Sequence, residues 1–165
     1  MKTNEKKHVH FREHIVQTDI NEIETILQSS DYFSHEEILL AQSLAGEKLA
    51  LGEASSYQFL FAEVENRISG FLCYGHVPLT VSSFDLYWMA VLNENRQGGL
   101  GTALLRKAET RIIALGGTRL YIDTSSRSQY IPTRHFYEQR GYQRGAFLPE
   151  YYGPEDGKVI YYKRL

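Results

Sequence analysis

The stretch Val91-Leu92-Asn93-Glu94-Asn95-Arg96-Gln97-Gly98-Gly99-Leu100-Gly101-Thr102 decides the fold, because it joins two elements of different hydrophobic period. Residues 84–92 are largely apolar, as expected of a buried strand. From Leu100 to Leu115 the apolar residues recur at helical spacing, and the pattern ends at Gly116. Glycines at a strand-to-helix junction let backbone N–H groups approach an anion, and the helix dipole favours a phosphate there. A glycine-rich turn without a ligand is the alternative interpretation.

Two common nucleotide motifs do not match this loop. A P-loop needs Gly-Lys-Ser/Thr, which the stretch lacks. The glycines at 98, 99 and 101 also do not give the Gly-x-Gly-x-x-Gly spacing of a dinucleotide fold. If the loop binds an anion, it therefore does so in another way.

The pattern on either side of the loop predicts an α/β fold. Asp19 with Glu22 and Ser34 with Glu37 have the spacing of capping boxes, so a helix should begin at each pair. The expected strands are 9–15, 57–64, 68–74, 84–92, 120–124, 142–148 and 159–163, and the expected helices start at 19, 34, 100 and 132. This order predicts a three-layer α/β/α sandwich with a mixed sheet, in a single domain spanning residues 1–165.

Composition excludes several classes of protein. The 165 residues carry a formal net charge of −2, which disfavours a nucleic-acid partner. Met1 to Lys7 are polar with no apolar region after them, and no apolar stretch is long enough to span a bilayer. The single cysteine, Cys73, forms no internal disulfide and fits a reducing compartment. Among the six histidines only His10 and His14 share a metal-ligand spacing, and on a predicted strand they would lie too far apart to chelate simply, so we expect no metal. Together these features predict a cytoplasmic protein without a membrane partner.

Three motifs in order resemble the GCN5-related N-acetyltransferase (GNAT) superfamily. Arg96-Gln97-Gly98-Gly99-Leu100-Gly101 resembles its pyrophosphate loop. Tyr87-Trp88-Met89-Ala90-Val91 resembles the strand that pairs with pantetheine, and Phe136-Tyr137-Glu138-Gln139-Arg140-Gly141-Tyr142 resembles its Phe-Tyr-x-x-x-Gly-Phe/Tyr signature. Many members have Asn and Ala six and three residues before that Phe, where this chain has Tyr130 and Thr133. The resemblance implies the acyl-CoA N-acyltransferase fold, with a mostly antiparallel sheet whose central parallel strands splay apart.

The resemblance also implies acetyl-CoA as cosubstrate and direct acetyl transfer to an amine. The residues expected to bind acetyl-CoA are Met89, Ala90, Val91, Arg96, Gln97, Gly98, Gly99, Leu100, Gly101, Thr102, Thr133 and Phe136. A backbone N–H near Val91 would polarise the thioester carbonyl.

Two side chains are candidates for proton transfer. Tyr137 is the candidate donor to the leaving thiolate, because a phenol is protonated at pH 7. Asp85 is the candidate base: it lies 14 residues before Gly99, where histone-modifying members carry a glutamate. Burial beside a cleft would raise the pKa of this carboxylate. The alternatives are a packed aromatic ring for Tyr137 and a turn cap with Ser82 or Ser83 for Asp85.

Four further residues are candidates for acceptor binding: Tyr87, Glu37, Ser126 and Tyr152. The alternatives are helix capping for Glu37, termination of a strand for Ser126 and packing of the last hairpin for Tyr152. We expect a small-molecule amine as acceptor and, from the resemblance, a homodimer. A protein N-acetyltransferase and a non-catalytic CoA-binding sensor remain the alternatives.

Overall fold

The computed structural model describes residues 8–165, so the polar segment Met1 to Lys7 lies outside the described residues. The strands are β1 Val9–Arg12, β2 Gln58–Val64, β3 Arg67–His76, β4 Ser83–Val91, β5 Arg119–Ser125, β6 Gln143–Gly153 and β7 Asp156–Arg164. The helices are α1 Asp19–Gln28, α2 His35–Leu51, α3 Leu100–Ala114 and α4 Ile131–Glu138, with short 3-10 turns η1 Gly52–Ala54, η2 Asn93–Gly98 and η3 Ser128–Tyr130.

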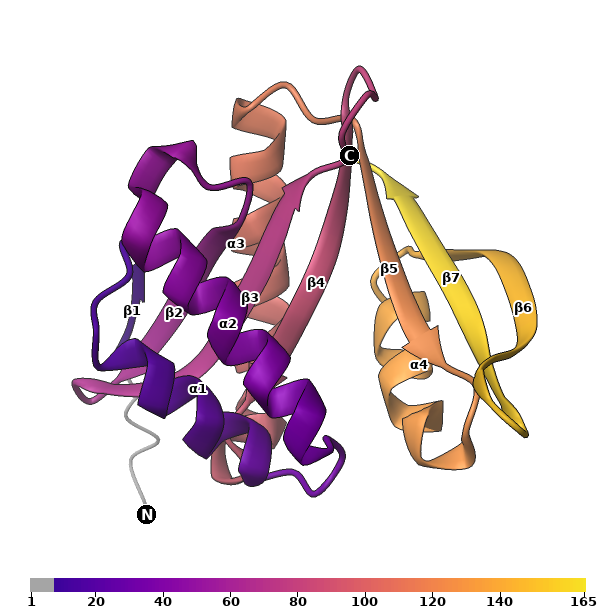
Figure 1. Ribbon diagram of the computed structural model, residues 1–165, viewed down its shortest axis with the longest axis horizontal. Helices are drawn as coiled ribbons and strands as arrows, with labels where there is room; N and C mark the ends of the chain where they lie inside the picture. The colour runs from indigo at the N-terminus through magenta and orange to yellow at the C-terminus, as the bar shows by residue number, and fades with distance from the viewer. Residues whose placement is uncertain (1–7) are drawn as a thin grey trace, which may run out of the picture. The chain divides into compact units, whose positions relative to one another are not determined.

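One seven-stranded sheet has the order β1-β2-β3-β4-β5-β7-β6 (Figure 1). β4 pairs with β5 in parallel, from Ser83 opposite Arg119 to Leu86 opposite Ile122. The pairs β1–β2, β5–β7 and β6–β7 are antiparallel. The mixed α/β fold predicted from the sequence is therefore confirmed.

The chain forms two compact units, and strands β3 and β4 contribute residues to both. The first unit holds the residues up to Cys73 together with Trp88–Ala108, and the second holds Tyr74–Tyr87 and Glu109–Leu165. Whether they act as one domain, as the sequence predicts, stays a prediction.

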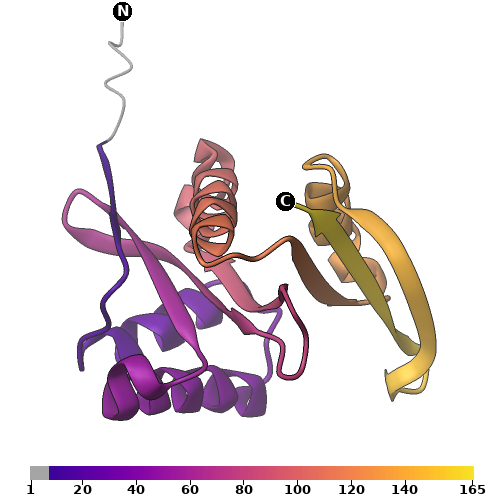
Figure 2. The ribbon, with the colours of Figure 1, turned by 90° about the horizontal axis from the view of Figure 1, so that it is seen from above.

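In the first unit, α1 and α2 lie side by side on one sheet face (Figure 1). Their apolar residues, among them Ile23, Ile26 and Ala41, pack against strand residues such as Phe71 and Cys73. Cys73 is 0% exposed, and burial raises the pKa of its thiol. α3 begins on the other face (Figure 2), where a Cβ at Gly70 would meet Leu104 of α3 at 2.9 Å.

The second unit has a core of aromatic rings between α4 and β7. Tyr137 of α4 lies 5.7 Å from Tyr142 and 6.4 Å from Tyr161 of β7, measured between ring centroids. Tyr142 donates a hydrogen bond to Glu109 and Tyr161 donates one to Glu138. These bonds satisfy the two hydroxyls while their rings are buried.

One of the two predicted capping boxes is present. Ser34 accepts a hydrogen bond from Glu37 N, and the Glu37 carboxylate accepts one from Ser34 N. The prediction for Asp19 is wrong: Thr18 is the N-cap residue, and it makes no side-chain capping bond. The Asp19 carboxylate is fully buried and binds the guanidinium of Arg12 instead.

The predicted boundaries shift most at the last hairpin. The sequence predicts strands 142–148 and 159–163, whereas β6 continues to Gly153 and β7 begins at Asp156. The sequence predicts Pro149 in a connection, but β6 is an edge strand, which tolerates proline. A register shift between Leu148 and Gly153 accommodates it, with Glu150 at φ 52°. At the other end of the chain, β1 stops at Arg12 rather than at Ile15.

Candidate functional site

The glycine-rich loop runs from the end of β4 to the start of α3, within the first unit. It forms the 3-10 turn η2 and then Gly99 in the left-handed conformation, at φ 78°. Ala103 N donates to Gly99 O at 3.0 Å, which begins the helix. Thr102 follows in the first helical turn, Leu100 is buried, and Gly101 is half-buried.

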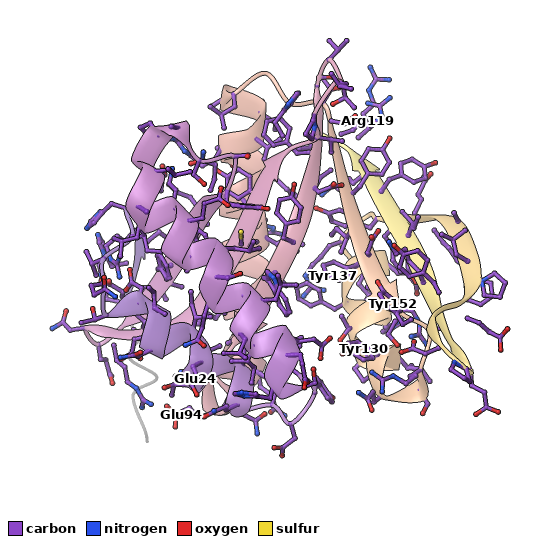
Figure 3. The ribbon with its side chains drawn as sticks, in the orientation of Figure 1. Glu24, Glu94, Arg119, Tyr130, Tyr137 and Tyr152 are labelled. Carbon is purple, nitrogen blue, oxygen red and sulfur yellow. The ribbon has the colours of Figure 1, made fainter. Side chains whose placement is uncertain are left out.

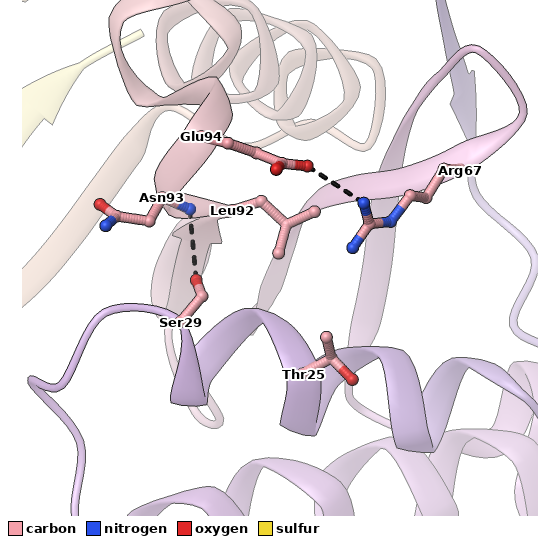
Figure 4. A pocket seen from close by; sticks show the side chains of 6 residues that line it. All are labelled: Thr25, Ser29, Arg67, Leu92, Asn93 and Glu94. Carbon is pink, nitrogen blue, oxygen red and sulfur yellow. Dashed lines mark hydrogen bonds and ion pairs between the residues drawn. The ribbon is translucent and has the colours of Figure 1, made fainter.

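Side chains from elsewhere in the first unit contact the loop. Asn93 N donates to the Ser29 hydroxyl at 3.2 Å, and Arg67 pairs with Glu94 at 3.1 Å (Figure 4). The Arg96 guanidinium lies 5.3 Å from the Tyr32 ring centroid. A pocket of about 450 Å³ lies between these contacts, lined by Thr25, Ser29, Arg67, Leu92, Asn93 and Glu94 (Figure 4). None of the predicted site residues lines it.

The exposed part of the loop fits an anionic group. Arg96, Gln97, Gly98 and Gly99 are all exposed. The positive φ explains a glycine at 99, but Gly98 has no positive φ, and a Cβ built there meets no atom within 4 Å. Nothing within the protein therefore requires glycine at 98, whereas a ligand lying against the backbone would. The first turn of the 15-residue helix α3 adds the positive end of the helix dipole.

The strand before the loop is largely buried in the first unit. Met89 is half-buried, while Ala90 and Val91 are buried, and Arg96 Nε lies 3.5 Å from Val91 O. On α4 of the second unit, Thr133 and Phe136 are half-buried. The Phe136 ring lies under the Arg140 guanidinium, 3.6 Å from centroid to Cζ.

Asp85 lies on the β4 segment that belongs to the second unit. It is half-buried and forms no hydrogen bond or ion pair with the described residues. Burial raises the pKa of its carboxyl, the charge of Asp123 raises it further, and Lys158 partly opposes both. The predicted rise in the pKa is therefore confirmed in direction and in cause. The alternative cap with Ser82 or Ser83 is not formed, because the described residues give the Asp85 carboxylate no hydrogen bond, and Ser82 Oγ bonds to Thr118 Oγ1 at 2.6 Å.

Tyr137 lies in the aromatic core of the second unit. Its ring is 4% exposed, and burial raises the pKa of the phenol, so it keeps its proton at neutral pH. Figure 3 shows it on α4. Among the residues that the structure describes, none forms a hydrogen bond with its hydroxyl, unlike those of Tyr142 and Tyr161.

Two of the four predicted acceptor contacts are engaged in structural bonds. The Glu37 carboxylate belongs to the capping box of α2. The Ser126 hydroxyl accepts from Gly157 N at 2.8 Å and so joins the end of β5 to β7. Tyr87 and Tyr152 are exposed, as the prediction requires (Figure 3 labels Tyr152).

The sequence analysis missed Lys158 of β7. Its Nζ lies 2.7 Å from Asp123 Oδ2 and 3.9 Å from the centroid of the Tyr151 ring. The signal in the sequence is a lysine directly before the apolar run Val159 to Tyr162. The partner on β5 follows from strand register, which the sequence does not reveal.

Residues 8–165 form no metal-binding cluster and no membrane-spanning helix. No group of three or more His, Cys, Asp or Glu side chains there is placed to hold a metal ion. No helix in the same range is long and apolar enough to cross a membrane.

Comparison with known proteins gives consistent matches. The family model for the acetyltransferase (GNAT) domain matches residues 55–144. A solved candidate acetyltransferase of the GNAT family from Desulfovibrio desulfuricans is 36% identical, with a TM-score of 0.93 over 95% of this chain and 99% of that one. No curated protein matched the chain.

More distant structures share the fold. An aminoglycoside 6'-N-acetyltransferase complexed with coenzyme A is 16% identical, with a TM-score of 0.73 over 94% of this chain and 96% of that one. The ribosomal-protein-S18-alanine N-acetyltransferase from Escherichia coli is 18% identical, with a TM-score of 0.73 over 95% and 94%. From the matched domain and the 36% identical structure, the chain belongs to the GNAT family of acetyltransferases.

Proposed function

We propose that this protein is an acetyl-CoA-dependent N-acetyltransferase that acts on the primary amine of a small molecule. The observation that carries the proposal is the carboxylate of Asp85, half-buried and without a hydrogen bond or ion pair among the described residues. A protein that only sensed CoA would have no need for such a group. The coenzyme A bound by the aminoglycoside acetyltransferase supports the choice of cosubstrate.

The proposal assigns separate roles to the glycine-rich loop, to Asp85 and to Tyr137. The glycine-rich loop and the start of α3 hold the pyrophosphate of acetyl-CoA through backbone N–H groups. When bound, acetyl-CoA supplies a thioester that reacts with a neutral amine. Asp85 accepts the proton of the attacking amine, and its raised pKa makes it a stronger base than an ordinary aspartate. The Tyr137 hydroxyl gives a proton to the departing thiolate.

The proposed acceptor follows from the exposed aromatic side chains of the second unit. Exposed tyrosines at 87, 151 and 152 offer aromatic surface to a compact, cationic acceptor. The distant structures include one enzyme for aminoglycosides and one for a ribosomal protein, and at 16% and 18% identity they share the fold alone. Acetylation of a protein amine is thus the second outcome that a screen must be able to detect.

A Gly98→Glu variant tests the loop directly. The new side chain has room and normal backbone geometry, so the fold should persist. Its carboxylate would lie where the loop is proposed to hold phosphate, and we expect the Kd for acetyl-CoA to rise about 10- to 100-fold, or roughly 1.4 to 2.8 kcal/mol. Isothermal titration calorimetry measures this, with NADH as the control ligand.

Gly46→Glu is the matched control for that variant. Gly46 lies in α2, and a Cβ there also meets nothing within 4 Å. Its Kd should equal that of the unaltered protein. If Gly98→Glu binds acetyl-CoA as tightly as the unaltered protein, the loop is a structural turn. If the unaltered protein does not bind acetyl-CoA, acetyl-CoA is not the cosubstrate.

The Tyr137→Phe variant tests the proton donor. Loss of the hydroxyl should lower kcat about 100-fold while leaving the Kd for acetyl-CoA unchanged. Thiol release in an amine screen gives the rate. Tyr142→Phe is the control from the same aromatic core, because its hydroxyl is already bound to Glu109 at 2.8 Å. Full turnover by Tyr137→Phe would leave this tyrosine with a packing role only.

A further inference from the structure

Strand register places a group of ionisable side chains on one sheet face of the second unit. Asp85 of β4 is opposite Tyr121 of β5, so Asp123, two residues further along β5, projects from the same face. In the β5–β7 pair, Asp123 is opposite Ile160 and Ser125 is opposite Lys158. Lys158 therefore shares this face too, diagonally across from Asp123.

The Lys158 ammonium is held tightly in this group. It lies 2.7 Å from Asp123 Oδ2, and the two side chains are 14% and 45% exposed. Its Nζ is 3.9 Å from the Tyr151 ring centroid and 6.0 Å from that of Tyr152. A lysine with both a carboxylate and an aromatic face around it has little freedom to turn elsewhere.

The carboxylates on this face differ in their ion pairs. Asp156 is paired with Arg127 at 3.1 Å, and Asp123 is paired with Lys158. Asp85 is the carboxylate of the group that has no cation of its own. The phenols of Tyr87, Tyr121, Tyr151 and Tyr152 also face it, and none of them supplies a positive charge. Arg119 of β5 projects from the same face opposite Ser83, with Arg164 of β7 opposite it, and the Arg119 guanidinium donates a hydrogen bond to Thr118 O.

We propose that the Asp123–Lys158 ion pair is a positioning pair for Asp85, with Lys158 limiting the repulsion between two carboxylates on one sheet face. This rests on the proposed function, in which Asp85 accepts the proton of the amine. The positive charge of Lys158 opposes the effect of the Asp123 charge on Asp85. Without the lysine, Asp85 would stay protonated to higher pH, and a smaller fraction of it would be available as a base at a given pH.

The titration of Asp85 itself tests this without acetyl-CoA or an acceptor. The carboxyl carbon of Asp85 is followed by 13C NMR as a function of pH, with assignment from Asp85→Asn. In Lys158→Met the midpoint should move to higher pH, and in Asp123→Asn it should move to lower pH. The double variant, which removes one charge of each sign, should return close to the midpoint of the unaltered protein.

Two further variants separate charge from folding. Lys158→Arg keeps the cation and should keep the midpoint. Lys163→Met removes another lysine of β7, whose Nζ lies 2.9 Å from Glu109 Oε1, and should leave Asp85 unmoved. The proposal is overturned if the Asp85 midpoint is the same in Lys158→Met and in the unaltered protein. It is also overturned if Lys163→Met shifts the midpoint as much as Lys158→Met does.

Failure of this inference differs from failure of the proposed function. If Asp85 titrates as expected but Asp85→Asn keeps full turnover, the electrostatic coupling stands and the base assignment falls. If the midpoints do not respond while Asp85→Asn loses activity, the base stands and the pair does not position it.

Discussion

The Asp85→Asn variant is expected to lose about 100- to 10,000-fold in kcat/KM for the acceptor amine, the usual contribution of a well-placed general base. Asparagine keeps the size and polarity of the side chain but cannot accept the amine proton. Binding of acetyl-CoA should be unchanged, since the proposed loop lies elsewhere in the chain. The rate is measured by thiol release, and the Kd by calorimetry.

The pH profile provides a second measure of the same residue. Because burial and Asp123 raise the pKa of Asp85, the carboxylate takes up a proton at a higher pH than an ordinary aspartate. The kcat/KM of the unaltered protein should therefore fall as the pH is lowered through that raised pKa, and the residual rate of Asp85→Asn should lack this step. Asp31→Asn is the control: Asp31 is exposed at φ 56°, a conformation that asparagine tolerates. An unchanged profile in Asp85→Asn would reject the base assignment.

The largest effect on stability is expected from Arg12→Met. Arg12 binds Asp19 through two hydrogen bonds of 2.8 and 2.9 Å, binds Glu63 at 2.8 Å, and lies over the Phe61 ring. Methionine would leave the carboxylate of Asp19, which is 0% exposed, without its cation. We expect the free energy of unfolding to fall by about 3–5 kcal/mol, measured by urea denaturation.

The same ion network predicts a pH effect with a definite sign. The hydrogen bond from Arg12 lowers the pKa of Glu63. A carboxyl whose pKa is lowered by folding stabilises the protein above its unfolded pKa, and that contribution is lost as the pH falls through the folded pKa. In Arg12→Met the free energy of unfolding should therefore fall less between neutral and acidic pH than in the unaltered protein.

Arg67→Met is the control for the buried ion network. Its pair with Glu94 is exposed on both sides, at 58% and 64%. Such a pair contributes about 0–1 kcal/mol, so the midpoint in urea should hardly move. Equal losses in Arg12→Met and Arg67→Met would contradict the view that burial makes the difference.

The sequence predicts those features that depend on neighbours along the chain. The box of Ser34 and Glu37 needs only a spacing of three residues, and it is present. The spacing of Asp19 and Glu22 is the same, but Arg12 captures the aspartate, and Glu63, 51 residues away from Arg12, completes that network. The residues near Asp19 in the sequence do not reveal a partner that strand pairing brings close to it.

In the candidate site, too, features that depend on sequence neighbours could be predicted, and features that depend on strand register could not. The glycine-rich loop is visible because strand, turn and helix follow one another directly. The raised pKa of Asp85 was predictable from its place on a central strand. The ion pair of Lys158 with Asp123 depends on the β5–β7 register. Tyr142 and Tyr161 have hydroxyl partners because Glu109 and Glu138 lie beside them, whereas Tyr137 has none among the described residues. The sequence does not reveal these neighbours.

The burial of Cys73 makes the protein convenient for labelling chemistry. It is the single cysteine of the chain, it is 0% exposed, and burial raises the pKa of its thiol. A colorimetric thiol reagent should therefore react slowly with the folded protein and report released coenzyme A with little background. A cysteine introduced at an exposed position such as Glu94 would then carry a fluorophore or spin label as the single reactive site in the chain.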